Sequence, residues 1–277
     1  MNDHQRLTRG TSALVVARNI RADIEAGRLA HGDQLPSTRE LAAEWGTSVA
    51  TINRAMQQLA DEGIVINKAR SSRIVNYPNT RHARSKPRRP IAILIGGYAG
   101  SGKTELGRIL ARNTSWPILD KDTTTRNVVE AALETLGQSP HDRESQTYLQ
   151  VIRPAEYQAL SATMIENLQC GVSVIVTAPF IREFSDRAWC DRLQADVAAL
   201  GADCEAVWVR CDPATMRTYL RRRGAARDSW KLANWEQYLS GLNLQFEPRM
   251  PHSIIDNSES ARPLQQQADE LLQRVLT

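Results

Sequence analysis

The chain has 277 residues, of which 42% are hydrophobic and 24% are charged, and its formal net charge is +4. No apolar run approaches the roughly 20 residues of a membrane-spanning helix, and the start of the chain lacks the apolar segment of a signal peptide. The four cysteines form no C-x-x-C pair, which disfavours a disulfide framework or a cysteine metal site. We therefore expect a cytoplasmic protein with no membrane segment.

Positive charge is concentrated in the first third of the chain. Residues 1–90 contain 15 Lys and Arg against 8 Asp and Glu, whereas residues 91–277 contain 20 against 23. A basic segment joined to a mildly acidic one indicates a nucleic-acid-facing module fused to a module of another kind.

The first third predicts helices followed by a small β-hairpin. Apolar residues recur at helical spacing over residues 12–27 and again up to Glu62. Ser37 and Glu40 form a capping box that opens a short helix ending before Gly46. Residues 64–67 and 73–76 have the pattern of two strands around a cationic tip. Two short helices joined by a Gly-containing turn predict a helix-turn-helix, and the hairpin predicts its wing.

The run GRLAHGDQLPSTRELA, residues 27–42, resembles the GntR-type winged-helix domain, whose pattern is G-x-L-x-x-G-x-x-L-P-S-x-R-E-L-A. The likeness continues to Gly63 and covers roughly residues 10–76. It implies a mostly helical domain with a small β wing. It also implies sequence-selective binding to a double-stranded DNA operator, usually as a homodimer on a palindromic site.

The same resemblance assigns DNA contacts to individual residues. Arg39 would contact a phosphate, and Arg70 or Arg73 of the wing would enter a minor groove. Val49 departs from the family, which often has an arginine there, and the tip 69–72 lacks the usual glycines. The alternative is that the helices serve dimerisation alone, and their polar, cationic face argues against it. The residues expected to face DNA from the second helix of the motif are Ser48, Thr51, Asn53 and Arg54.

Residues 77–90 predict a linker between two domains, 1–76 and 91–277. The stretch contains proline and arginine but no acidic residue, and nothing in it is apolar enough to fold. Two roles stay open for it. It would either contact the DNA backbone, most strongly at low salt, or serve as a hydrated tether.

Residues 91–111, IAILIGGYAGSGKTELGRILA, contain a G-x-x-x-x-G-K-[ST] loop between a strand and a helix. In such a loop, backbone N–H groups and the N-terminus of the following helix face phosphate oxygens. Lys103 would reach the β- and γ-phosphates, and the Thr104 hydroxyl would ligate Mg²⁺. A plain glycine-rich turn is the alternative. The predicted ATP-binding residues are Gly97, Gly100, Ser101, Gly102, Lys103 and Thr104.

From residue 91 onward, strand and helix patterns alternate. This alternation predicts an α/β domain with a parallel sheet covered on both faces, with ligands at the carboxyl ends of the strands. The expected strands are residues 91–95, 116–119, 171–178, 204–211 and 253–256, and the expected helices are residues 103–113, 125–136, 148–169, 184–200, 213–224, 230–242 and 262–276.

Residues 91–258 resemble the P-loop kinases of small molecules, a group that includes gluconate kinase, chloramphenicol phosphotransferase, polynucleotide kinase and the zeta-toxin kinases. The resemblance implies ATP and Mg²⁺ as cofactors and a hydroxyl group as phosphate acceptor. Asp120 and Asp122 stand where the family has an acid after the second strand, and Arg126 stands where it has a substrate-orienting arginine. Either aspartate could be the catalytic base, and we favour Asp122 over Asp120. Mg²⁺ would be bound by Thr104 together with Asp120 or Asp122. Alternatively, Asp122 caps the helix that follows.

The arginine-rich segment 217–227 falls where such kinases carry a lid that closes over ATP. Its catalytic candidates are Arg223 and Arg227, which share one face if the helix continues past Gly224. A solvated helix face is the alternative. Thr177 departs from the family, in which related sequences often have an acid before Ala-Pro-Phe. That departure weakens the expectation of phosphate transfer more than that of nucleotide binding.

A polar region between the core helices is a weaker candidate for holding the acceptor. Ordinary exposed helix polarity explains it equally well. Its residues are His141, Asp142, Arg143, Glu144, Tyr148, Arg153, Glu156 and Tyr157.

Three functions fit this sequence. The leading one is a transcriptional regulator whose DNA-binding domain is fused to an ATP-binding, kinase-like sensor of an unknown effector. The second is an active small-molecule kinase that also binds DNA to regulate its own pathway. A nucleic-acid kinase delivered by the winged helix ranks last, because a shared fold is a poor guide to substrate.

Overall fold

The computed structural model describes residues 12–68, 72–77, 87 and 89–276. They fall into two compact units, residues 1–80 and 81–277, which divide inside the predicted linker. Arg70, a predicted DNA contact, lies outside the described residues, as does most of that linker. Within the described ranges, no helix has the length and apolar character needed to cross a membrane.

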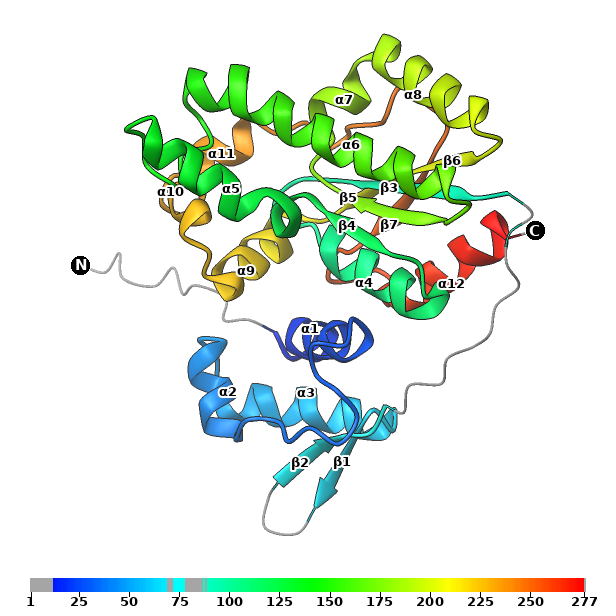
Figure 1. Ribbon diagram of the computed structural model, residues 1–277. Helices are drawn as coiled ribbons and strands as arrows, with labels where there is room; N and C mark the ends of the chain where they lie inside the picture. The colour runs from blue at the N-terminus through cyan, green and yellow to red at the C-terminus, as the bar shows by residue number, and fades with distance from the viewer. Residues whose placement is uncertain (1–11, 69–71, 78–86, 88, 277) are drawn as a thin grey trace. The chain divides into compact units, whose positions relative to one another are not determined.

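The first unit consists, in its described part, of three helices followed by an antiparallel hairpin (Figure 1). A serine begins each helix: Ser12, Ser37 and Ser48 each accept a hydrogen bond from the backbone N–H three residues later. The Glu40 side chain accepts from Ser37 N at 2.7 Å, which confirms the predicted capping box. The elements are α1 (Ala13–Glu25), α2 (Thr38–Glu44), α3 (Val49–Asp61), β1 (Val65–Lys68) and β2 (Ser72–Val75).

A small apolar core joins these elements. Ile20 of α1, Ile52 and Leu59 of α3, and Val75 of β2 are almost completely buried. Val75 pairs with Val65 across the hairpin, and β1 packs against α3. A two-stranded hairpin is marginal alone, so this packing fixes the wing to the second helix of the helix-turn-helix.

The second unit is built on a five-stranded parallel sheet with the order β4-β5-β3-β6-β7. The central strand β3 precedes the phosphate loop, and all six of its residues are buried. Burial on both faces explains why its sequence is continuously apolar rather than alternating. The strands are β3 (Ile91–Gly96), β4 (Ile118–Asp120), β5 (Val174–Thr177), β6 (Asp203–Arg210) and β7 (His252–Asp256).

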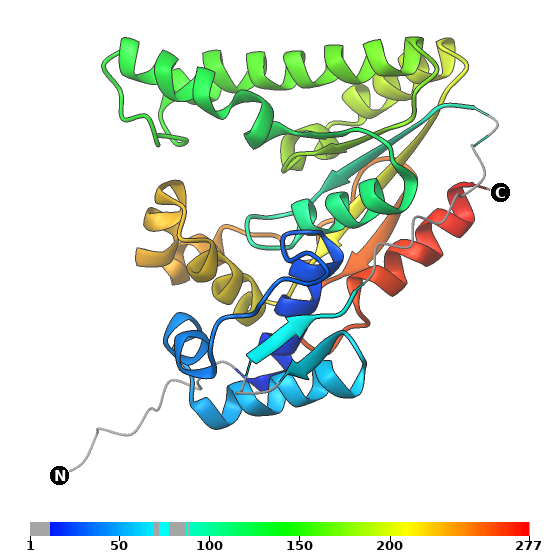
Figure 2. The ribbon, with the colours of Figure 1, turned by 60° about the horizontal axis from the view of Figure 1, so that its bottom comes forward.

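Helices cover both faces of this sheet, as the alternating pattern predicted. In Figures 1 and 2, α6 and α8 lie over one face, and α4 and α12 pack together on the other. The helices are α4 (Lys103–Thr114), α5 (Lys121–Thr135), α6 (Arg153–Gln169), α7 (Ile181–Ser185), α8 (Arg187–Ala199), α9 (Pro213–Arg223), α10 (Ser229–Ala233), α11 (Trp235–Ser240) and α12 (Leu264–Val275), with a π-helix η2 (Tyr148–Ile152) and a 3-10 helix η3 (Ala226–Asp228).

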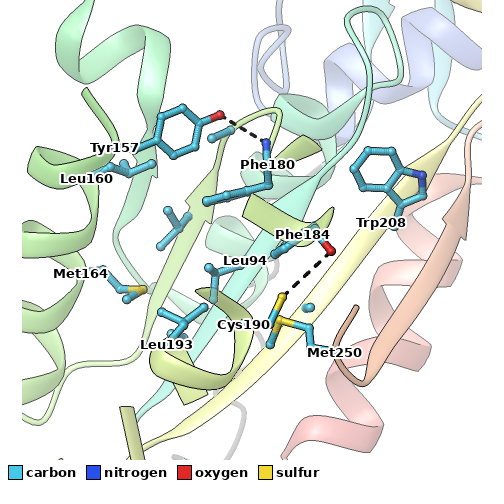
Figure 3. Packing of buried hydrophobic residues seen from close by; sticks show 14 of the residues in the cluster. Leu94, Tyr157, Leu160, Met164, Phe180, Phe184, Cys190, Leu193, Trp208 and Met250 are labelled. Carbon is cyan, nitrogen blue, oxygen red and sulfur yellow. Dashed lines mark hydrogen bonds between the residues drawn. The ribbon is translucent and has the colours of Figure 1, made fainter. Parts of the chain in front are cut away.

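An aromatic core under α6 and α8 positions the loop that follows β5 (Figure 3). The rings of Phe180 and Phe184 stack with their centroids 5.0 Å apart, and the Tyr157 hydroxyl accepts from Phe180 N at 3.3 Å. Phe180 has a φ of 50°, a left-handed conformation that is uncommon for a bulky side chain. Pro179, just before it, accepts from Gly97 N at 3.2 Å. The core therefore fixes the β5 loop directly against the phosphate loop.

Four predicted helices were wrong at their boundaries. Helix α5 begins at Lys121 rather than at residue 125, because Asp120 caps it. The helix expected over 184–200 is two helices that meet at Asp186, and that over 230–242 is broken at Asn234. The helix expected over 148–169 begins with the π-helix η2.

Candidate nucleotide site and nucleic-acid interface

The phosphate loop requires glycine where neighbouring chain segments approach it closely. Gly100 has a φ of 81°, and a Cβ there would lie 2.7 Å from the Met216 carbonyl oxygen of α9. Gly102 has a φ of 94°, and a Cβ there would lie 2.2 Å from Asn257 Nδ2. Both positions combine left-handed backbone with a lack of space for any side chain.

The loop presents polar groups that lack a protein partner. Gly102 is the N-cap of α4 and gives the first N–H groups of the helix no side-chain acceptor. Ser101 is 1% exposed, and its hydroxyl finds no hydrogen-bond partner among the described residues. Such buried groups normally have partners, and an anion at the N-terminus of α4 would supply them.

Lys103 is arranged as a cation facing the loop. Its Nζ donates to the Tyr98 carbonyl oxygen at 2.8 Å, within the loop itself. Its pKa is lowered to about 8, first by burial and then by the positive charge of Arg223, while the charges of Asp122 and Asp120 act in the opposite direction. The ammonium group is therefore destabilised without an anion, which is the electrostatic setting of a phosphate site.

Asp120, at the carboxyl end of β4, gathers three donors. Its Oδ2 accepts from Thr177 Oγ1 at 2.6 Å and from Thr104 Oγ1 at 3.0 Å, and its Oδ1 accepts from Thr123 N at 2.9 Å. The β4–β5 register sets Asp120 directly opposite Thr177. The expectation that Asp122 caps the following helix was wrong, because Asp120 is the cap and Asp122 lies in the first turn.

The same geometry gives the departure at Thr177 a physical role. Related sequences often carry an acid at this place, and here a hydroxyl holds the carboxylate of the neighbouring strand. The acid next to Thr104 is thus supplied by β4 rather than by β5. Sequence analysis singled out Asp120 and Thr177 separately but did not predict the hydrogen bond between them.

Asp122 lies on the loop side of α5. Its Oδ1 is 3.2 Å from Lys121 Nζ, and its charge raises the pKa of Lys103. Arg126 follows one turn later and is exposed. One helix thus carries both residues, and the Asp122 charge acts on Lys103 of the phosphate loop.

Lys121, which sequence reasoning missed, is part of a buried polar network. Its Nζ donates to Glu156 Oε1 at 2.8 Å, and the same oxygen accepts from Thr125 Oγ1 at 2.6 Å. Tyr148 donates to Glu156 Oε2 at 2.8 Å, and burial together with the Glu156 charge raises the tyrosine pKa. The only sequence signal was a lysine between two aspartates. This network joins α5, η2 and α6.

The other acceptor candidates of the polar region contact protein groups. Arg153 donates to both carboxylate oxygens of Glu183 at 2.8 and 2.9 Å and lies over the Tyr157 ring. Arg143 donates to the carbonyls of Pro140 and Asp142. Two further candidates make local contacts: Asp142 accepts from the backbone of Glu144, and His141 lies 3.6 Å from Glu130.

In the arginine-rich segment, α9 ends at Arg223, and Gly224 follows with a φ of 57°. The prediction that Arg223 and Arg227 share one helix face was therefore wrong. The backbone of Arg227 belongs to η3, and its side chain lies outside the description. Arg223 instead pairs with Asp228.

In the first unit, three of the predicted DNA-facing residues lie together at the start of α3. Ser48 caps α3 and contacts the Thr51 hydroxyl at 2.8 Å. Both residues line a pocket of about 520 Å³ with Arg54, beside the N-terminus of α1 at Ser12. Arg39 of α2 is exposed.

Arg73 joins the wing to both helices of the helix-turn-helix. It donates to Thr38 Oγ1 of α2 at 2.8 Å and to Asn53 Oδ1 of α3 at 3.2 Å. Two residues predicted to contact DNA, Arg73 and Asn53, are thus bonded to each other. This contact fixes the wing relative to α3.

Two family models match the chain. The model of bacterial regulatory proteins, gntR family, matches residues 13–75, and that of the AAA domain matches residues 93–244. Over 66 residues the chain is 36% identical to YdeL of Bacillus subtilis, described as an uncharacterised HTH-type transcriptional regulator, covering 24% of this chain and 14% of that protein. Over 107 residues it is 32% identical to shikimate kinase of Moorella thermoacetica, covering 36% of this chain and 57% of that protein.

Among solved structures, the chain is similar to the APS kinase CysC of Mycobacterium tuberculosis, solved with AMPPNP and APS. The identity is 19%, the TM-score is 0.46, and the match covers 69% of this chain and 100% of that one. The chain belongs to the AAA domain family and carries, ahead of that domain, a DNA-binding domain of the gntR regulator family, as both resemblances predicted.

Proposed function

We propose that the protein is a transcriptional regulator whose kinase-like unit binds ATP with Mg²⁺ and uses it to control DNA binding. The observation that carries this proposal is the fusion itself: one chain combines a GntR-type domain with a complete phosphate loop. The fusion of these two units is accounted for if ATP binding to the kinase-like unit changes DNA binding by the other unit.

The residues of the loop fit ATP. The N-terminus of α4, the Ser101 hydroxyl and the Lys103 ammonium group would hold the phosphates, because each lacks an anionic partner or is destabilised without one. ATP supplies a transferable phosphoryl group when bound. Arg223 and Arg227 would add positive charge from the lid segment.

The residues next to the loop fit Mg²⁺. Thr104 Oγ1 lies 3.0 Å from Asp120 Oδ2, so one hydroxyl and one carboxylate lie next to each other. Among the described residues there is no cluster of three or more acidic, histidine or cysteine side chains that could bind a metal. Mg²⁺ needs no such cage, because it commonly binds one or two protein oxygens, phosphates and water.

In the DNA-binding unit, the exposed residues of α2, α3 and the wing would contact the operator. Arg39 and Arg54 would contribute charge, and Ser48, Thr51 and Asn53 would contact phosphate or base edges. Arg73 and, outside the described residues, Arg70 would serve the wing. A homodimer is the expected form on a palindromic site.

A second function, an active small-molecule kinase, is favoured by one specific observation. A unit that only sensed ATP would not need a carboxylate near the loop lysine. Asp122 Oδ1 nevertheless lies 3.2 Å from Lys121 Nζ, and the Asp122 charge raises the pKa of Lys103. As the base, Asp122 would orient the acceptor hydroxyl, and Arg126 would bind the rest of the acceptor. Transfer to a hydroxyl-bearing metabolite, lost in Asp122→Asn with ATP binding unchanged, would identify this function.

The proposal is tested by separating its two binding activities. Lys103→Ala should weaken ATP binding at least tenfold, measured by calorimetry, because the phosphates lose a buried cation. It should leave binding to promoter-region DNA fragments unchanged when ATP is absent. Arg187→Ala, in an exposed ion pair on α8, is the matched control. Unchanged ATP affinity in Lys103→Ala would show that the loop is not the phosphate site.

The DNA arm of the proposal uses salt dependence. Arg39→Ala should lower DNA affinity for all fragments alike and reduce the slope of log affinity against log salt by about 0.9, the value for one phosphate contact. Fluorescence anisotropy between about 50 and 200 mM salt measures this slope. Failure of the purified protein to bind any promoter-region fragment would contradict the regulator function.

A further inference from the structure

The end of α9 contains an ion pair whose partners differ sharply in burial. Arg223 donates through Nε to Asp228 Oδ2 at 2.9 Å, and its terminal nitrogen donates to the same oxygen. The Asp228 side chain is 2% exposed, whereas that of Arg223 is 40% exposed. The carboxylate is thus fixed inside the fold, and the guanidinium reaches outward from it.

The carboxylate is held by more than this one partner. Lys231 Nζ lies 3.9 Å from Asp228 Oδ1 and 6.0 Å from the centre of the Tyr238 ring. Burial raises the pKa of Tyr238, and the charge of Asp228 adds to that effect. Asp228 therefore belongs to a compact group of side chains from η3, α10 and α11.

This group is attached to the phosphate loop. The Tyr98 hydroxyl, in the loop, donates to the Asn243 carbonyl at 3.0 Å and accepts from Asn243 N at 3.2 Å. On the other side, α9 lies against Gly100, whose missing side chain leaves room for the Met216 carbonyl. The segment from α9 to residue 243 is thus anchored to the loop before Arg223 and after Tyr238.

The geometry of the pair leaves part of the guanidinium available. An arginine has five N–H donors in a planar fork, and Asp228 uses one edge of it. The donors on the opposite edge point away from the buried carboxylate. Helix α9, which ends at Arg223, packs against Gly100 of the loop, and the Arg223 charge lowers the pKa of Lys103. Two cations near one loop can bind phosphate oxygens together.

We propose that Asp228 is a positioning residue for ATP, which holds Arg223 so that its remaining N–H donors face the terminal phosphates beside Lys103. This inference rests on the proposed function, in which the loop binds ATP. Asp228 touches no nucleotide and acts only through Arg223. Arg223 without Asp228 would sample many rotamers, and ordering it would then cost part of the binding free energy.

The test measures ATP and ADP affinities of the full chain by calorimetry with Mg²⁺ present. We expect Asp228→Asn and Arg223→Ala each to weaken ATP about tenfold, and ADP clearly less, because the lost contact is to the terminal phosphate. The double variant should bind ATP no more weakly than Arg223→Ala. Asp191→Asn, the same substitution in the exposed pair with Arg187, is the matched control and should leave both affinities unchanged.

Three results with these variants would overturn the inference, and a fourth comes from Arg223→Lys. They are an unchanged ATP affinity in Asp228→Asn, equal losses for ATP and ADP, and losses that add in the double variant. Arg223→Lys keeps the charge without the fork and serves if Asp228→Asn fails to fold. It should lose ATP affinity like Arg223→Ala, and wild-type affinity in it would equally overturn the inference. A wild-type chain that binds neither nucleotide would instead overturn the proposed function.

Discussion

At the scale of single residues, Thr177 departs from the family pattern and takes a structural role through its contact with Asp120. Its side chain is almost completely buried and donates to Asp120 at 2.6 Å. Asp120 in turn accepts from Thr104, the residue that closes the phosphate loop. The hydroxyl is one of three donors that together orient this carboxylate, as partners of metal ligands commonly do.

Thr177→Val tests this role, because it removes the hydroxyl and keeps the shape. We expect the Mg²⁺ concentration that half-saturates ATP binding to rise about tenfold, the lower end of the effect of losing a partner of a metal ligand. ATP binding without Mg²⁺ should change little. Thr177→Ser, which retains the donor, is the control and should behave as the wild type. Equal Mg²⁺ requirements in both variants would contradict the role of the hydroxyl.

At the scale of helices, the network around Glu156 ties α5 to η2 and α6. The side chains of Lys121 and Glu156 are 6% and 3% exposed, and each oxygen of Glu156 accepts at least one hydrogen bond. A buried pair with all its hydrogen bonds made is strongly destabilised when one partner is removed, because the other charge remains buried. The network therefore holds the helix that carries Asp122.

Glu156→Gln should lower the free energy of unfolding of the kinase-like unit by about 3 kcal/mol, because Lys121 loses its buried partner and keeps only the more exposed carboxylate of Asp122. Tyr148→Phe removes one hydrogen bond and should cost only about 1 kcal/mol. Denaturant unfolding followed by circular dichroism measures both changes. Glu130→Gln, at a more exposed position on α5, is the control with an expected change near zero. A Glu156→Gln variant as stable as this control would contradict the structural importance of the network.

Sequence reasoning predicted elements well where the signal was local and failed where it was not. The phosphate loop, the capping box at Ser37 and the buried strand β3 each follow from a few adjacent residues. The buried position of Glu156 depends on a contact between residues far apart in the chain, the one with Lys121. A lysine–glutamate pair 35 positions apart leaves no periodic pattern, so the sequence indicates only that Glu156 lies in a polar region.

At the scale of the whole molecule, regulation requires that ATP binding to one unit change the DNA affinity of the other. Regulation requires a coupling free energy, which is reciprocal: if ATP changes DNA affinity by some factor, DNA changes ATP affinity by the same factor. A chain in which the two units act independently would show a factor of one. The fusion of two binding units in one chain therefore predicts a measurable coupling and not merely two activities.

We expect ATP with Mg²⁺ to change the affinity of the full chain for its best promoter-region fragment at least fivefold, the lower end of typical coupling. Saturating DNA should shift ATP affinity by an equal factor, measured by calorimetry on the preformed complex. Lys103→Ala, which should bind ATP at least tenfold more weakly, should need correspondingly more ATP for the same effect on DNA affinity. Arg39→Ala should keep the coupling factor while binding DNA more weakly. Because the reciprocal factors must agree for any reversible binding, unequal values would trace the ATP effect to aggregation or phosphate transfer. A factor of one in both directions would mean that the kinase-like unit acts without regulating DNA binding.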